Sequence, residues 1–231
     1  MGFINPRSRV RISPLVQNWH IQKYLLSHHM LQVCHLHQNV CALHTTRSGT
    51  LDELATAPAF QATQCITMEQ PHRAAFEVVF QPSELYRSAV DATITTQKGL
   101  TLVVKHADCL PILVYHPKGV IAAIHAGRRS TQQHITKKVL RYIRAHFAAQ
   151  DQIYLWFGPA LCASCHTLNQ DKTLHYDLYR QNRLQAESVF SSEKIILSTN
   201  DTCTAHTPNA FYSYRGDGPG VAMNYSAITL R

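Results

Sequence analysis

The sequence has no run of about 18 apolar residues, so it lacks the segment that a membrane-spanning helix requires. Its first residues include basic side chains but neither a continuous apolar stretch nor a small-residue cleavage site, so no signal peptide is predicted. It also lacks the G-x-G-x-x-G, Walker A and G-x-S-x-G patterns of dinucleotide-binding proteins, NTPases and serine hydrolases. We therefore expect a cytoplasmic protein with no membrane partner and with chemistry outside those classes.

Charge is scarce and unbalanced, because only 16% of the residues are charged and the formal net charge is +8. A positive excess suits an anionic ligand such as phosphate, or a nucleic acid. The densest basic cluster lies at 137–144, on the expected solvent face of a helix, and no nucleic-acid-binding signature accompanies it. We therefore expect a small-molecule ligand and no nucleic-acid partner.

The seven cysteines are an odd, scattered set, which is a poor disulfide framework. We interpret most of them as small buried hydrophobic residues. Cys162-Ala-Ser-Cys165-His166 spells the c-type haem attachment pattern, but haem attachment belongs to exported chains. The pair could also be a redox dithiol, half of a zinc site, or buried packing, and no second C-x-x-C completes a four-cysteine site.

The most informative stretch is Leu100–Ser130, which contains three apolar runs. Pro117-Lys118-Gly119 separates the last two and predicts a three-residue hairpin loop that ends in a left-handed glycine. In that register Pro111 faces His125, and Cys109 lies one diagonal step away, about 7–8 Å across the pair. One metal ion could then bind both side chains, whereas a two-residue loop would place them on opposite faces.

A short basic segment, Ala126-Gly127-Arg128-Arg129, follows His125 and leads from the strand into a predicted helix. Ser130 or Thr131 can cap that helix, and an apolar residue every fourth position, from Ile135 to Phe147, gives it a buried face. Arg129 beside a helix start is a candidate anion site. An ordinary strand–turn–helix with surface arginines explains the same spacing.

The remaining pattern predicts an α/β (α+β) fold, a single domain with a mixed sheet and flanking helices. Residues 32–43 read as one strand with His35 and His37 on the same face, and residues 47–90 read as an insertion-like, partly ordered connection. We expect a divergent N-terminal segment at 1–30 and one catalytic domain at 31–231.

Several motifs together resemble the YfiH-like family, which is labelled polyphenol oxidase or laccase-domain and also peptidoglycan editing factor. Ala-Asp-Cys-Leu-Pro at 107–111 and His-Ala-Gly-Arg-Arg at 125–129 are similar to its A-D-C-x-P and H-A-G-W-R-G signatures. Further matches lie at 91–96, 157–160 and 211–218, and the likeness spans roughly residues 33–230.

The resemblance implies a zinc-dependent purine nucleoside phosphorylase that also deaminates adenosine. Its substrates would be adenosine, inosine, guanosine or methylthioadenosine, with phosphate as partner. Leu36-His37-Gln38-Asn39-Val40 occupies the place of the family's Q-V-H-G-x-x-V, so the implied zinc ligands are His37 (or its neighbour His35), Cys109 and His125. Such a three-ligand site keeps its fourth position open.

The implied roles of the other residues follow from the same motifs. Asp108 is a candidate acid/base, or a group that fixes the turn, and Arg129 is a candidate for phosphate or for developing charge. Arg215 and Asp217 would line the substrate pocket or hold the C-terminal turn. Nothing in the sequence sets the oligomeric state.

The chain departs from the family pattern, and alternatives stay open. Arg128 stands in place of tryptophan and Ser130 in place of glycine, so a degenerate, non-enzymatic zinc protein is one alternative. Copper is the alternative metal, but multicopper oxidases need several H-x-H pairs and the chain has one, His35-Leu36-His37. A peptidoglycan precursor editing hydrolase is the third alternative.

Overall fold

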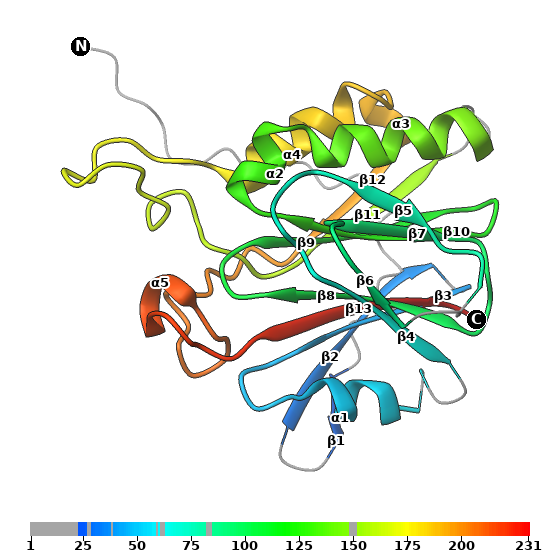
Figure 1. The fold of residues 1–231 in the computed structure, drawn as a ribbon, viewed down its shortest axis with the longest axis horizontal. Helices are drawn as coiled ribbons and strands as arrows, with labels where there is room; N and C mark the ends of the chain where they lie inside the picture. The colour runs from blue at the N-terminus through cyan, green and yellow to red at the C-terminus, as the bar shows by residue number, and fades with distance from the viewer. Residues whose placement is uncertain are drawn as a thin grey trace.

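The computed structural model describes residues 39–58, 60, 63–81, 85–147 and 152–231 with their side chains, and the backbone alone of 23–26 and 29–37. Within this part the chain forms two stacked sheets with helices on both outer faces (Figure 1). Most of the N-terminal segment predicted at 1–30 lies outside the described residues.

The first sheet has seven strands and the second has six, and both mix parallel and antiparallel pairs. The first has the order β1 (Lys23–Leu26), β2 (His29–His37), β3 (Val40–Thr45), β13 (Asn224–Leu230), β8 (Leu100–His106), β4 (Gln64–Met68), β6 (Tyr86–Arg87). The second has the order β12 (Ile195–Thr199), β11 (Ile153–Phe157), β9 (Leu110–His116), β10 (Val120–Ala126), β7 (Ala92–Thr95), β5 (Phe76–Val78). The α+β prediction is confirmed, with two sheets where one was expected.

The helices form the outer layers of the fold (Figure 1). The six-stranded sheet is covered by α2 (Arg128–Gln132), α3 (Ile135–Phe147) and α4 (Leu178–Glu187), and α1 (Leu51–Thr56) covers the other sheet. A short α5 (Tyr214–Asp217) lies on the left side of the view. In the described part of the chain no helix is both long and apolar enough to cross a membrane.

Strand β9 shows why its sequence is a continuous apolar run. Ile112 and Val114 pack toward the helices, whereas Leu113 and Tyr115 pack between the two sheets. Because side chains alternate along a strand, a strand covered on both faces needs apolar residues at every position. The six-stranded sheet is therefore the buried centre of the fold.

The predicted β9–β10 hairpin is confirmed in register and in turn geometry. His116 pairs with Val120 and Pro111 pairs with His125. Gly119 has a φ of 76°, the left-handed conformation that the three-residue loop requires.

The helical exit from β10 differs in one detail from the prediction. Gly127, not Ser130 or Thr131, is the N-cap of α2, and the Ser130 hydroxyl donates to the carbonyls of His125 and Gly127. A left-handed His134 (φ 64°) then separates α2 from α3. The predicted apolar face of α3 is confirmed, with Ile135, Val139 and Ile143 fully buried.

Two other sequence interpretations are wrong. Residues 32–43 belong to a hairpin of β2 and β3, because the chain reverses direction after His37. The 47–90 region is not an insertion: it supplies α1, β4, β5 and β6, and β5 pairs in parallel with β7 inside the six-stranded sheet. Strands this short, separated by loops that contain proline, show little hydrophobic periodicity, which is why the sequence did not predict them.

Candidate metal centre

Three side chains with metal-binding atoms gather where β10 ends, namely His72, Cys109 and His125. One donor atom from each lies within 4.8 Å of the others, and the Cys109 Sγ to His72 Nε2 distance is 3.6 Å. The His72 and His125 rings meet edge to face with centroids 4.6 Å apart. His125 is buried, whereas His72 and Cys109 are half-buried. The group is therefore closed beneath and open on one side.

Asp91, which is fully buried, holds this arrangement together. Its Oδ1 lies 3.0 Å from His125 Nδ1 and accepts the His72 backbone N–H, while its Oδ2 accepts the N–H groups of Arg73 and Ala74. These bonds stabilise a turn in which His72 and Ala74 have positive φ angles. A carboxylate on one nitrogen of a histidine leaves the other nitrogen to face a metal.

Electrostatics favour charged forms of Cys109 and His125 in spite of burial. Burial disfavours the thiolate form of Cys109, but the charges and hydrogen bonds of His125 and His72 outweigh this effect and lower the pKa of Cys109 to about 6. Burial also opposes the imidazolium, but Cys109 and Asp91 raise the pKa of His125 to about 9. Burial of Asp91 is outweighed by hydrogen bonds from His125, Arg73 and His72, and its pKa is lowered. A thiolate, the form that ligates metals, is thus available near neutral pH.

Gly127 keeps the space between the candidate ligands clear. A Cβ at this position would lie 2.7 Å from His72 Cδ2 and 2.9 Å from Cys109 Sγ, closer than carbon and sulfur atoms approach in proteins. The backbone of Gly127 therefore packs directly against two of the three donor side chains. Two imidazoles and one thiolate around such a cradle are a donor set that fits zinc.

His72 is the residue that the sequence interpretation missed. The first ligand was predicted at His37, which ends β2 and whose side chain lies outside the described residues, so that assignment stays a prediction. The signal for His72 was Gln70-Pro71-His72, which keeps the Q-x-H order of the family motif. The β5–β7 pairing brings this segment beside Asp91, and Gln133 also donates to the His72 carbonyl.

Asp108 is saturated with hydrogen bonds. Its Oδ1 accepts from the hydroxyls of Thr204 and Ser213, and its Oδ2 accepts from the Arg215 backbone N–H, each at 2.6 Å. It has a left-handed φ of 89°, and its carbonyl accepts the Leu161 N–H. Asp108 thus ties the turn that carries Cys109 to three distant segments, at Leu161, at Thr204 and at Ser213–Arg215.

Two arginines follow the His125 strand, and the more buried of them is not the one that the sequence predicted as the anion contact. Arg129 is exposed, whereas Arg128 is half-buried and near His166. Burial lowers the pKa of His166, and the charges of Arg215 and Arg128 lower it further. Because α2 has only five residues, side chains supply the positive charge here. His166 Nδ1 is buried and has no hydrogen-bond partner among the described residues.

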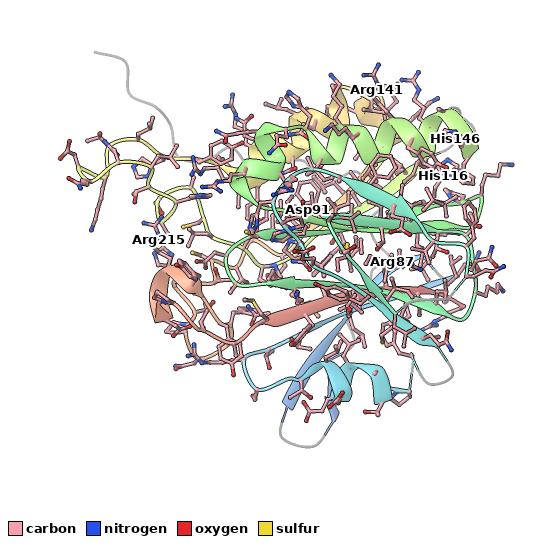
Figure 2. The ribbon with its side chains drawn as sticks, viewed as in Figure 1. Arg87, Asp91, His116, Arg141, His146 and Arg215 are labelled. Carbon is pink, nitrogen blue, oxygen red and sulfur yellow. The ribbon has the colours of Figure 1, made fainter. Side chains whose placement is uncertain are left out.

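Arg215 and Asp217 have structural contacts at the C-terminal turn. Figure 2 shows Arg215 at the end of the molecule where α5 lies, and its guanidinium donates to the hydroxyl and carbonyl of Thr167. Asp217 forms a two-pronged ion pair with Arg47, at 3.0 and 2.9 Å, and accepts the Ser213 N–H. These contacts fit the alternative in which Asp217 holds the turn, and substrate contact by either residue stays a prediction.

A basic hollow lies elsewhere, between α3 and α4. It is lined by Lys137, Arg141, Arg144 and Ser188, with a volume of about 460 Å³. Figure 2 shows Arg141 on the outer side of the helical layer and Asp91 within the fold. The hollow and the metal-binding atoms are therefore on different sides of this layer.

Comparison with known proteins places these residues in a family. The model of a family described as multi-copper polyphenol oxidoreductase laccase matches residues 46–173. A purine nucleoside phosphorylase of Campylobacter jejuni is 26% identical over 165 residues, which cover 67% of this chain and 72% of that protein. Adenosine deaminase RL5, from an unidentified prokaryote, is 29% identical over 134 residues, which cover 55% of this chain and 50% of RL5.

A solved structure shares the fold. The crystal structure of YlmD from Geobacillus stearothermophilus superposes with a TM-score of 0.79 at 22% identity, covering 91% of this chain and 98% of that chain. The likeness concerns the arrangement of the two sheets and their helices.

Proposed function

The chain belongs to the YfiH-like, laccase-domain family, and on this premise we propose that it is a zinc-dependent purine nucleoside phosphorylase that also deaminates adenosine. The observation that carries the proposal is the group formed by His72, Cys109 and His125, braced by Asp91 and open on one side. One relative is named a purine nucleoside phosphorylase and another an adenosine deaminase, and these names support the substrate class.

We assign the zinc ligands to His72, Cys109 and His125. His125 would bind through Nε2, because Nδ1 faces Asp91, and His72 would bind through Nε2, the nitrogen nearest to Cys109. Zinc held by three protein ligands is a Lewis acid that can lower the pKa of a bound water to about 7. Asp91 orients the buried imidazole, and the Gly127 backbone leaves room for the ion.

The anion site would be formed by Arg128, Arg215 and His166. Phosphorolysis needs phosphate at C1′ of the ribose, where its oxygen replaces the purine base and gives ribose 1-phosphate. Guanidinium groups hold phosphate through paired hydrogen bonds, and the unpartnered Nδ1 of His166 is a further contact. The arginine that replaces the family's tryptophan thus adds a cation, and Arg129 is the alternative cation.

Asp108 would act by positioning. Both of its carboxylate oxygens accept hydrogen bonds, so its first effect is to hold the Arg215 loop beside the turn that carries Cys109. The deamination reaction, in which water replaces the 6-amino group of adenosine and ammonia leaves, would use the same pocket.

Copper oxidation has weaker support. The two groups of metal-binding side chains among the described residues contain two histidines with one cysteine and one histidine with three cysteines. Copper(II) centres of oxidases are histidine-rich, so neither group suits them.

The test is turnover of adenosine by the zinc-loaded protein, with and without phosphate, with products separated by chromatography. Adenine that forms only with phosphate indicates phosphorolysis, and inosine in either condition indicates deamination. The substrate panel adds inosine, guanosine and methylthioadenosine. Bound zinc without turnover would contradict the proposed enzymatic activity and favour a degenerate zinc protein. Phenol oxidation by a copper-loaded protein would favour a laccase.

The phosphate site has its own test with a matched control. An Arg128→Met change should raise KM for phosphate about 10- to 100-fold, because a hydrogen bond to a charged group contributes about 1.5–3 kcal/mol. Arg129→Met, next to it but exposed, should leave KM within about 2-fold, as expected for a solvated surface charge. A larger rise in KM for phosphate in Arg129→Met than in Arg128→Met would assign phosphate binding to Arg129 instead.

A further inference from the structure

A second group of metal-binding side chains lies outside the candidate metal centre and comprises Cys162, Cys165, Cys203 and His206. One donor atom from each lies within 4.8 Å of the others. Cys165 Sγ is 3.1 Å from His206 Nε2, and Cys162 Sγ is 3.9 Å from His206 Nδ1. None of these residues has a role in the proposed reaction.

Two short turns present the four side chains. Residues 162–165 form a C-x-x-C turn in which the Cys165 N–H donates to the Cys162 carbonyl, and residues 203–206 form a C-x-x-H turn. A parallel bridge between Ala160 and Cys203 places the two turns side by side. The Cys162 N–H donates to Cys203 Sγ at 3.4 Å, so one turn supplies a backbone donor to a sulfur of the other.

We propose that this group is a structural zinc site with three thiolates and one imidazole. Zn–S bonds of about 2.3 Å and Zn–N bonds of about 2.0–2.1 Å place tetrahedral ligands about 3.5–3.8 Å apart, which is the scale of this cluster. Three soft sulfurs with one imidazole select zinc among the divalent metals of the cell by ligand type. Four protein ligands leave no open position, so the site stabilises structure and takes no part in turnover.

The geometry also separates a zinc site from the other interpretations of Cys162-x-x-Cys165. All six described cysteines are free, and only Cys41 and Cys203 among them are buried, so the expected buried packing is wrong for the half-buried Cys162 and Cys165. A dithiol redox pair needs two sulfurs, whereas here a third sulfur and an imidazole converge on the same point. The C-x-x-H turn supplies the second half that no second C-x-x-C provides.

This zinc site would brace the candidate metal centre. Thr204, which lies between Cys203 and His206, donates to Asp108, and Asp108 precedes Cys109 in the chain. Leu161, which precedes Cys162, donates to the Asp108 carbonyl. An ion at the second cluster would therefore fix two of the three segments that hold the Cys109 turn, the third being the Ser213–Arg215 loop.

The experiment is elemental analysis of the full chain, produced with zinc and purified with a phosphine reductant and no chelator. The wild type should carry about two zincs, and Cys165→Ser and Cys109→Ala should each carry about one, because each change removes a ligand from a different site. Cys65→Ser, at a half-buried cysteine outside both groups, is the matched control and should keep both. His206→Cys should also keep both, because four thiolates bind zinc equally well.

Cobalt substitution provides a readout that does not depend on the first site. In the Cys109→Ala protein, cobalt(II) should show thiolate-to-cobalt charge transfer and intense tetrahedral d–d bands, and the added Cys165→Ser change should abolish them. One zinc per chain that is lost in Cys109→Ala and kept in Cys165→Ser would overturn the proposal, as would a Cys162–Cys165 disulfide found by mass spectrometry. Failure of adenosine turnover would leave the second zinc in place, so the two proposals fail separately.

Discussion

Gly127 provides the sharpest structural prediction, because an added methyl group there would meet two proposed zinc ligands. In Gly127→Ala the new Cβ would lie 2.7 Å from His72 Cδ2 and 2.9 Å from Cys109 Sγ. Ordinary carbon contacts are about 3.5–4.0 Å, so His72 must move by about 1 Å. Metal–ligand distances vary by only about 0.2 Å, so a displacement of about 1 Å should weaken zinc binding. The loss should be at least 10- to 100-fold, which is about the effect of removing a residue that supports a ligand.

The assay combines zinc content, chelator competition and denaturant unfolding. Gly127 has a φ of −74°, which alanine adopts without strain, so the loss should fall on metal binding more than on folding. Gly119→Ala is the matched control, since nothing lies within 4 Å of an added Cβ there and only its left-handed φ of +76° disfavours alanine. It should lose about 1–2 kcal/mol of stability and keep its zinc. Normal zinc affinity in Gly127→Ala would refute the assigned ligand geometry.

Two further predictions concern Asp91 and His44. Asp91→Asn should weaken zinc binding at the candidate centre about 10- to 100-fold by chelator competition, because the supporting partner of His125 loses its charge; unchanged affinity would contradict that role. Burial lowers the pKa of His44 to about 3 in the folded state. A buried histidine that resists protonation stabilises the fold above its unfolded pKa of about 6.5, and this stability is lost as the pH falls below that value. The His44 contribution should fall by about 2 kcal/mol between pH 7 and pH 5, so the unfolding free energy of His44→Gln should depend less on pH over this window; equal slopes would contradict the assignment.

The local part of the candidate site was predictable from sequence. Pro117-Lys118-Gly119 determines the hairpin loop, the loop determines the register, and the register places Cys109 and His125 on one face. Each of these steps depends on residues that are close together in the chain. Sequence patterns report such short-range geometry well.

The remaining proposed ligands depend on contacts between distant segments. His72 reaches Cys109 through the parallel β5–β7 pairing and a left-handed turn that Asp91 stabilises. Cys203 and His206 reach the C-x-x-C turn through a single parallel bridge at Ala160. No periodicity marks either connection, so spacing alone predicted an insertion at one place and an incomplete site at the other.

The most direct test of the central claim compares His72→Ala with His37→Ala in zinc content and in adenosine turnover with phosphate. We predict that His72→Ala loses one zinc per chain and its activity, whereas His37→Ala keeps both, because His72 is the imidazole that lies 3.6 Å from Cys109. Loss of zinc and turnover in His37→Ala, with both retained in His72→Ala, would contradict the account.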